Sequence, residues 1–306
     1  MSFKKFSSGL LACVLLTGCA SLQLPKFSFP SLPFAAPTAE QRLSTAKNVA
    51  AEAGFQQELI ETSPFSITSY VKIKKEGGPL HVYIEGDGYA WVTRNRISAD
   101  PTPRDPLVLE LAVQDKASNV AYLARPCQYT PMEKNPSCQE EYWTSKRFSQ
   151  EAVSSMNQAV EKLVQEAKAT ELHLIGYSGG GAVAALIAAW RTDVKSLTTI
   201  AGNLDPVGLN EYHQVSPLDT ASLTPLNVAE KLREIPQNHF RGSKDAVIPK
   251  QVPENFAKQL APSKCIHLLE VTDADHTSGW KEIWPKLLTY PLSCTGPKNR
   301  QVCSGG

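Results

Sequence analysis

The sequence predicts an α/β protein in which a mostly parallel sheet carries helices on both faces. Short apolar runs of strand length alternate along the chain with longer segments whose apolar residues recur every three or four positions. The chain has 306 residues, of which 42% are hydrophobic and 20% charged, and this is enough for one large domain with its own core. In sheets of this class, functional residues gather at the carboxyl ends of the strands.

The expected elements begin with a helix capped by Thr38 and Gln41, which have capping-box spacing. Residues 55–63 and 65–74 alternate like two antiparallel strands joined at Pro64. The remaining expected strands are 80–84, 120–123, 172–176, 197–201, 239–242 and 265–271. The remaining expected helices are 106–116, 145–168, 179–191, 227–232, 252–260 and 277–290. Short apolar strands separated by helices predict parallel pairing between two helical layers.

The first nineteen residues have the three zones of an export signal. Two lysines precede an apolar run over 10–16, and the small-residue segment Leu-Thr-Gly-Cys ends at Cys19. The run is too short to cross a bilayer, so we expect residues 1–18 to be a removed signal peptide rather than a buried helix. Leu-Thr-Gly-Cys resembles the lipobox of bacterial lipoproteins. That resemblance implies acylation of Cys19 and, because Ala20 follows it, sorting to the outer membrane of a Gram-negative cell envelope.

The sequence indicates four segments, of which the signal peptide at residues 1–18 is the first. After the signal peptide, residues 19–54 hold the lipidated cysteine, a tether with four prolines and the first helix. Residues 55–291 form the folded domain, and 292–306 form a C-terminal tail. The lipid makes a membrane the expected partner, whereas 31 basic against 30 acidic residues leave no charge surplus for nucleic acid. No oligomeric state is indicated.

The cysteines beyond Cys19 suit an oxidising compartment. Cys127 and Cys138 flank a Pro-containing loop and are expected to close it, and Cys294 and Cys303 flank a similar segment in the tail. These pairings leave Cys265, which begins an apolar run and is therefore expected to be a buried free thiol. A zinc site is the alternative, but no Cys-x-x-Cys or His-x-x-x-His spacing supports it, so neither a metal nor another cofactor is expected.

A candidate nucleophile lies where the 172–176 strand meets the following helix. Gly-Tyr-Ser-Gly-Gly, centred on Ser178, has the Gly-x-Ser-x-Gly pattern. A serine there sits on a strained turn that lifts its hydroxyl above the sheet, and the flanking glycines avoid collisions with neighbouring strands. The helix N-terminus directs its N–H groups at the same point. A phosphate-binding loop is the alternative, but no Gly-Lys-Ser/Thr follows.

A serine nucleophile needs a histidine base and an acid that orients the base, and in this arrangement the acid comes first in the chain. His276 follows the last expected strand, which places it at a carboxyl end; His213, in a polar insertion, is the alternative base. Asp245 follows the preceding strand by a turn, so one helix and one strand separate it from His276. Asp205 is the alternative acid, although a helix cap or a turn also explains it.

Together these segments resemble the α/β-hydrolase family. The Gly-Tyr-Ser-Gly-Gly turn, the Gly-Ser-Lys-Asp-Ala-Val-Ile-Pro loop and the Asp-His after the last strand carry the likeness, which extends over residues 55–290. The resemblance implies an eight-stranded, mostly parallel sheet with an antiparallel strand near its start. It also implies Ser178 as nucleophile, His276 as general base, Asp245 as orienting acid and the N–H of Gly179 as an oxyanion donor.

The segment expected to complete the oxyanion hole departs from that family. Many members carry His-Gly after their third strand, whereas this chain has Glu-Gly-Asp-Gly at 85–88. The N–H of Asp87 is the best candidate for the second donor. Carboxylates beside a negative transition state are unfavourable unless they point away or are paired, for example with Arg94, Arg96 or Arg125.

These features predict a lipid-anchored serine hydrolase that cleaves carboxylic esters or thioesters through an acyl-enzyme, with peptidase or amidase activity left open. The insertion at 204–226 is polar and lacks the amphipathic apolar helix of an interfacially activated lipase, which favours small or polar ester substrates. The alternative function is a non-catalytic envelope lipoprotein that uses the fold as a binding module.

Overall fold

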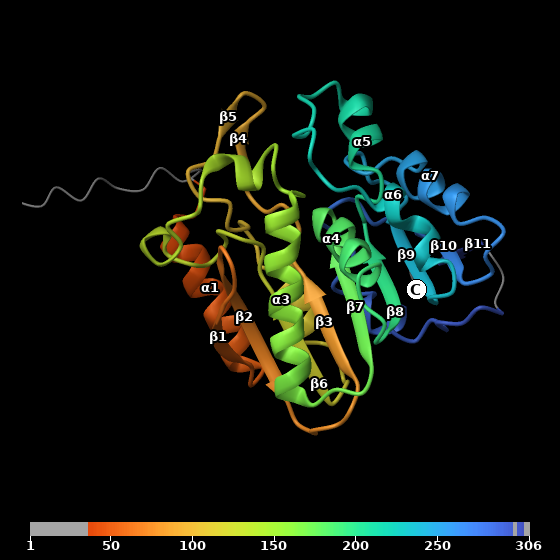
Figure 1. Ribbon diagram of the computed structural model, residues 1–306, viewed down its shortest axis with the longest axis horizontal. Helices are drawn as coiled ribbons and strands as arrows, with labels where there is room; N and C mark the ends of the chain where they lie inside the picture. Colours follow the sequence, from red (N-terminus) through yellow and green to blue (C-terminus); the bar gives the residue numbers. More distant parts are fainter. Residues whose placement is uncertain (1–35, 296–298, 303–306) are drawn as a thin grey trace, which may run out of the picture. The chain divides into compact units, whose positions relative to one another are not determined.

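Within residues 36–295 and 299–302, which are the residues that the computed structural model describes, the chain folds around a nine-stranded sheet (Figure 1). The strand order is β1-β2-β6-β3-β7-β8-β9-β10-β11. β2 runs antiparallel to both of its neighbours, and the other neighbouring pairs are parallel. The strands are Gln56–Glu61 (β1), Ser66–Ile73 (β2), Leu80–Ile84 (β3), Asn119–Leu123 (β6), Leu172–Tyr177 (β7), Val194–Ile200 (β8), Gln237–Gly242 (β9), Ile266–Val271 (β10) and Asn299–Val302 (β11).

All eight strands expected from the sequence are present in this sheet. β11 is an additional strand in the segment expected to be a tail, and it pairs with β10 at the sheet edge. A separate hairpin of β4 (Trp91–Thr93) and β5 (Arg96–Ile97) follows β3. The predicted signal peptide, Cys19 and the tether up to residue 35 lie outside the described residues. In the described part of the chain, no helix is both long enough and apolar enough to span a bilayer.

Side chains cap the first turn of four of the described helices, namely α1, α3, α5 and α6. Thr38 and Gln41 form the expected capping box of the first helix, with reciprocal hydrogen bonds of 3.2 and 2.8 Å. The longest helix begins after Ser149, whose Oγ accepts the N–H of Ala152, rather than at residue 145. The helices are Ala39–Glu52 (α1), Leu107–Ala112 (α2), Gln150–Ala167 (α3), Gly179–Ala188 (α4), Pro206–His213 (α5), Pro225–Val228 (α6), Gln251–Gln259 (α7) and Trp284–Leu287 (α8).

The closing helix expected at 277–290 is wrong in length, because only Trp284–Leu287 is helical. The side chain of Asp275 accepts the N–H groups of Thr277 and Ser278 at 2.7 Å each, which bends the chain into a turn instead of a first helical turn. Gly279 then has a φ of +84°, which ends any helical path at that residue.

Helices cover both faces of the sheet, as the sequence predicted. α3 and α4 cross one face in Figure 1. On the other side of β3, the hydroxyl of Tyr83 donates to Asp115, just beyond α2, and accepts from Nε1 of Trp284 in α8, at 2.8 and 3.2 Å. β6, an interior strand of the sheet, is buried along its whole length. A sheet covered in this way leaves its strand ends and loops as the places for polar chemistry.

Two disulfides join described residues. Cys127–Cys138 closes the loop that the sequence predicted. The expected pairing of Cys294 with Cys303 and the expected free thiol at Cys265 are wrong, because Cys265 is bonded to Cys294. Cys265 directly precedes β10, and the chain that leaves α8 returns toward this edge of the sheet before β11 pairs with β10, so Cys294 meets Cys265 on the way. Cys303 lies outside the described residues.

Replacing both Cys127 and Cys138 by serine is expected to lower the free energy of unfolding by about 2–3 kcal/mol. The bridge joins residues 11 apart, and the estimate is the loop entropy that the unfolded chain regains without it. Urea unfolding of the variant and the wild type, each with and without reductant, measures the difference. Reductant should destabilise the wild type more than the variant; an equal effect would contradict the assigned contribution.

Candidate active site

Ser178 lies on a strained turn between β7 and α4. Its φ of 50° and ψ of −121° are a conformation that costs a residue other than glycine about 1–3 kcal/mol. Backbone bonds fix the turn: the N–H of Ser178 donates to Ile200 at 3.0 Å, and its carbonyl accepts from Gly181 and Asn203 at 3.0 and 2.8 Å. These bonds place the partly buried serine at the carboxyl end of β7.

The glycines on either side of Ser178 are required by close backbone approach. A Cβ on Gly176 would lie 2.3 Å from the carbonyl oxygen of Gly180. A Cβ on Gly180 would lie 2.3 and 2.4 Å from the carbonyl oxygens of Ile84 and Glu85, at the end of β3. Because these obstacles are backbone atoms, no side-chain rearrangement could relieve the collision. This is the collision that the Gly-x-Ser-x-Gly pattern is expected to avoid.

The structure brings Ser178, His276 and Asp245 together in one hydrogen-bonded chain. Nε2 of His276 lies 3.2 Å from Oγ of Ser178, and Nδ1 lies 3.0 Å from Oδ2 of Asp245. The Asp245 carboxylate is fully buried, and its Oδ1 accepts the N–H groups of Val247 and Ile248 at 2.8 Å each. The carboxylate is therefore fixed by backbone amides while it faces the imidazole, which is the geometry of an acid that orients a base.

Aromatic residues that the sequence reasoning did not single out hold the backbone of His276. The indole N–H of Trp280 donates to the carbonyls of Asp275 and His276 at 3.0 and 3.2 Å. The hydroxyl of Tyr177 donates to the carbonyl of His276 at 2.8 Å, and the two rings lie 5.3 Å apart. Burial, with nearby carboxylates, raises the pKa of Tyr177, so its proton remains available for this bond. The position of Tyr177 inside the serine motif could have indicated this role.

The alternative base and acid have other partners. Nε2 of His213 lies 2.7 Å from the carbonyl oxygen of Val247, and the contact is exposed. Asp205 caps α5, because its Oδ1 accepts the N–H of Gly208 at 2.9 Å, and its Oδ2 accepts from Asn255 at 2.9 Å. Neither residue enters the hydrogen-bonded chain at Ser178.

The loop after β3, Glu85–Gly88, lies against the turn that carries Ser178. A Cβ on Gly179 would lie 1.9 Å from Oδ1 of Asp87, and a Cβ on Gly86 would lie 3.3 Å from Cβ of Ser178. Gly179 and Asp87, the two residues expected to donate to an oxyanion, are therefore neighbours beside the serine. Gly179 is also the first residue of α4, so the positive end of the helix dipole faces the same point.

The two carboxylates of this loop are accommodated in different ways. Glu85 is 2% exposed; its Oε1 accepts the N–H of Gly86 at 3.0 Å and its Oε2 accepts the hydroxyl of Tyr122 at 2.8 Å. Burial raises the pKa of Glu85 to about 7, although both hydrogen bonds favour the ionised form. Asp87 is paired with two guanidiniums, Nη1 of Arg125 at 3.3 Å and Nε of Arg147 at 3.1 Å.

Of the arginines expected to pair with this loop, only Arg125 contacts Asp87 among the described residues. Arg94 instead reaches the carbonyl of His213 at 3.5 Å, and Arg96 is exposed. Arg147 was not expected: it lies in the loop before α3, within a segment read as helix, and nothing in its local pattern indicates a partner 60 residues earlier.

A groove of about 740 Å³ lies elsewhere, at the amino ends of β3 and β6. It contains none of the residues around Ser178; its lining is Pro79, His81, Val113, Gln114, Asp115, Lys116, Ala117, Ser118, Pro285, Leu288 and Thr289. The candidate active site is therefore defined by the hydrogen-bonded chain at the carboxyl ends of the strands and not by cavity size. In the described part of the chain, no three His, Cys, Asp or Glu side chains are grouped so that they could hold a metal ion.

Neither a protein-family profile nor a curated protein matches this sequence, but solved structures match its fold. An esterase from Pyrococcus furiosus has a TM-score of 0.55 at 13% identity, over 80% of this chain and 90% of the esterase. The 2,6-dihydroxy-pseudo-oxynicotine hydrolase has a TM-score of 0.56 at 18% identity, over 82% and 70%. Est1E from Butyrivibrio proteoclasticus has a TM-score of 0.53 at 13% identity, over 76% and 95%. The chain has the α/β-hydrolase fold that its motifs predicted.

Glu85→Gln is expected to remove a pH dependence of stability. Because the folded-state pKa is raised from 4.5 to about 7, the folded protein keeps a proton in this window that the unfolded chain has already released. The wild type should therefore lose about 3 kcal/mol of unfolding free energy relative to the variant as the pH rises through the window, with no further change above it. Urea unfolding of both proteins across this range measures the difference, and a pH-independent difference would contradict the assignment.

Proposed function

We propose that the protein is a serine hydrolase that cleaves carboxylic esters through an acyl-enzyme. The observation that carries the proposal is the hydrogen-bonded chain from Ser178 through His276 to Asp245, with distances of 3.2 and 3.0 Å. A hydroxyl within reach of an imidazole, and an imidazole oriented by a buried carboxylate, form the arrangement that converts a weak alcohol into a nucleophile. The hydrolase and esterase names of the structural relatives agree with this chemistry.

In the first half-reaction, Oγ of Ser178 attacks the ester carbonyl carbon while Nε2 of His276 takes the hydroxyl proton. Asp245 stabilises the imidazolium through Nδ1. The carbonyl oxygen becomes an oxyanion, to which the N–H groups of Gly179 and Asp87 donate. The C–O bond to the alcohol then breaks, and Nε2 returns the proton to the leaving alkoxide. Water repeats the sequence on the acyl-serine, which releases the acid and restores the hydroxyl.

The surroundings of the site support a small ester as substrate. Large apolar side chains are exposed on segments that follow strands of the sheet: Trp91 in β4 after β3, Tyr212 in α5 after β8, and Val247 in the loop after β9. They offer contact to a short acyl or alkyl group. α5, the helix of the insertion at 204–226, is only eight residues long, which supports the expectation that no long apolar lid covers the site.

We further propose that the mature protein begins at a lipidated Cys19 and is anchored in a bacterial envelope membrane. The proposal rests on the Leu-Thr-Gly-Cys segment directly after a short apolar run. Stable anchoring requires two or more acyl chains, since one chain binds a bilayer only marginally. The substrate would then be reached from the membrane surface.

Ser178→Ala is expected to lower the turnover of nitrophenyl esters by roughly 10⁶-fold and to abolish labelling by a fluorophosphonate probe. The variant keeps the fold because alanine removes only the hydroxyl. His213→Ala is the matched control for His276→Ala: the first should keep wild-type turnover, and the second should lose it. A series of acyl lengths in the same assay tests the preference for small esters.

Undiminished labelling of Ser178→Ala would contradict the assignment of the nucleophile. If folded wild-type protein neither hydrolyses any ester of the series nor takes up the probe, the fold serves binding rather than catalysis. In that case the non-catalytic envelope lipoprotein becomes the better description of the molecule.

Cys19→Ser is expected to move the protein from the membrane fraction to the soluble fraction of cells, because the acylated sulfur is lost. Incorporation of a labelled fatty acid should disappear in the same variant. Turnover of the extracted protein on a water-soluble ester should not change, since Cys19 precedes the folded domain. Membrane association that survives the substitution would contradict the anchor.

A further inference from the structure

The Glu85–Gly88 loop is supported from one side by polar side chains outside the triad. Nε2 of Gln128 donates to the carbonyl of Gly86 at 3.0 Å, and Oε1 of Gln128 accepts the N–H of Arg125 at 3.0 Å. Gln128 is 1% exposed, so both bonds are protected from water. One buried amide therefore joins the loop to the backbone that carries Arg125.

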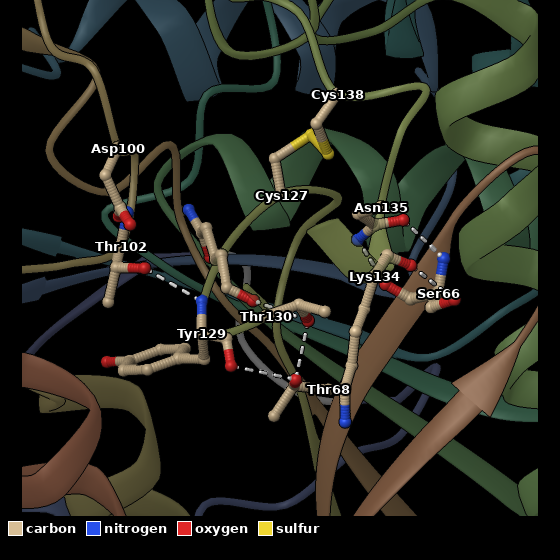
Figure 2. The surroundings of a disulfide bond; sticks show 11 residues. Ser66, Thr68, Asp100, Thr102, Cys127, Tyr129, Thr130, Lys134, Asn135 and Cys138 are labelled. Atoms are coloured by element: carbon tan, nitrogen blue, oxygen red, sulfur yellow. Dashed lines mark hydrogen bonds between the residues drawn. A yellow bond between two sulfur atoms is a disulfide. The ribbon is translucent and has the colours of Figure 1, made fainter. Parts of the chain in front are cut away.

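The segment that carries Gln128 is itself cross-linked by a disulfide and hydrogen-bonded to the rest of the domain. The Cys127–Cys138 disulfide closes this segment into a loop at its two ends. Figure 2 shows the hydrogen bonds that join the loop to Ser66 and Thr68 of β2. Asn135 exchanges two hydrogen bonds of 2.8 Å with the backbone of Ser66. The hydroxyls of Thr130 and Thr68 lie 2.7 Å apart. The support of the Glu85–Gly88 loop thus extends through a cross-linked segment to a strand of the main sheet.

The second support is a pair of guanidiniums around Asp87. Arg125 and Arg147 contact different oxygens of the carboxylate, and Arg125 also donates to the carbonyl of Arg147. Both guanidiniums lie over the ring of Phe148, at 5.4 and 5.1 Å from its centroid. The carboxylate is therefore fixed in orientation where it packs against Gly179.

Because the Asp87 carboxylate packs against Gly179, its negative charge has to be compensated if an oxyanion is to form there. The Asp87 carboxylate touches the residue whose N–H is expected to donate to an oxyanion, so it would repel the negative charge that develops there. Two guanidiniums in contact with the carboxylate offset that repulsion. If either guanidinium is lost, the carboxylate is offset less completely, and its repulsion of the developing oxyanion increases.

These guanidiniums are used within the protein and not presented to a ligand. Nη1 of Arg147 donates to the carbonyl of Thr144 at 2.8 Å, and its Nη2 contacts Oδ1 of Asn210 at 3.3 Å, while Nε faces Asp87. Arg125 is 4% exposed. An anionic substrate group would have to displace existing bonds in order to reach either side chain.

We propose that Arg147 and Arg125, with Gln128, are positioning residues for the oxyanion hole: they neutralise Asp87 and keep the Asp87 N–H directed at the carbonyl oxygen of the substrate. The proposal rests on the proposed function, because it requires an oxyanion to form at Ser178. These residues act through Asp87 and touch no substrate. Their effect belongs to the transition state, so it changes kcat and leaves substrate binding unchanged.

A double-mutant cycle between Arg147 and Asp87 tests this proposal. In the presence of Asp87, Arg147→Gln should lower kcat on a nitrophenyl ester by about 10- to 100-fold, with KM within about twofold. In the Asp87→Asn background the same substitution should cost less than about threefold, since no carboxylate remains to be neutralised. The inhibition constant of a trifluoromethyl ketone, which forms a tetrahedral adduct with serine, should rise in parallel with the loss of kcat.

Arg191→Gln is the matched control. Arg191 also forms a close pair with an aspartate, Asp193, but at the amino end of β8, away from Ser178. Its substitution should leave kcat and KM unchanged while it removes an Arg–Asp pair. Arg147→Lys keeps the charge without the planar fork and should lose less activity than Arg147→Gln; should the glutamine variant fail to fold, the cycle is run with lysine.

An equal loss of kcat in both backgrounds would overturn the proposal, because Arg147 would then not act through Asp87. A loss confined to KM, largest for an anionic ester, would assign the guanidiniums to substrate binding and would also overturn it. Failure of this inference is separable from failure of the proposed function: active, probe-labelled wild type with unaffected arginine variants leaves the serine hydrolase in place. Wild type without activity or labelling removes both.

Discussion

The close approach between the backbone at Gly180 and the end of β3 is the constraint on which the rest of the site depends. Gly180 lies so near the carbonyls of Ile84 and Glu85 that no side chain fits between them. This contact forces α4 to begin immediately after Ser178 and brings the Glu85–Gly88 loop against it. The strained φ of Ser178 is the local cost of that geometry, and backbone hydrogen bonds to β8 and the segment beyond it sustain the strain.

Sequence reasoning succeeded where the structural signal is local. The capping box at Thr38, the apolar strands and the turn at Ser178 depend on residues within a few positions of one another, so the local sequence pattern predicts them. His276 and Asp245 were also predicted to lie beside Ser178, and the structure brings the three side chains together, because each follows a strand and the carboxyl ends of parallel strands share one edge. The positions that these residues occupy follow from topology rather than from side-chain detail.

Sequence reasoning failed where contacts join distant segments. The pairing of Cys265 with Cys294 depends on the path of the chain after α8. Cys294 and Cys303 are closer in the sequence, and this proximity favoured the wrong pairing. The final helix is short because Asp275 uses its carboxylate on two backbone N–H groups, a competition that apolar periodicity does not reveal. Arg147 reaches Asp87 across 60 residues, and no periodic or motif signal specifies such a contact.

An acidic loop beside an expected oxyanion is the feature that most separates this site from the family it resembles, and its two acids pose different problems. Glu85 is buried and forms no ion pair with any described arginine or lysine. Burial raises its pKa to about 7, while the hydroxyl of Tyr122 and the N–H of Gly86 donate to its carboxylate. Asp87 is partly exposed and is paired with Arg125 and Arg147. Near neutral pH the loop therefore loses part of its negative charge at Glu85 and has the remainder compensated at Asp87. Under the proposed function, a backbone N–H that donates to an oxyanion there would face no unbalanced charge from either acid.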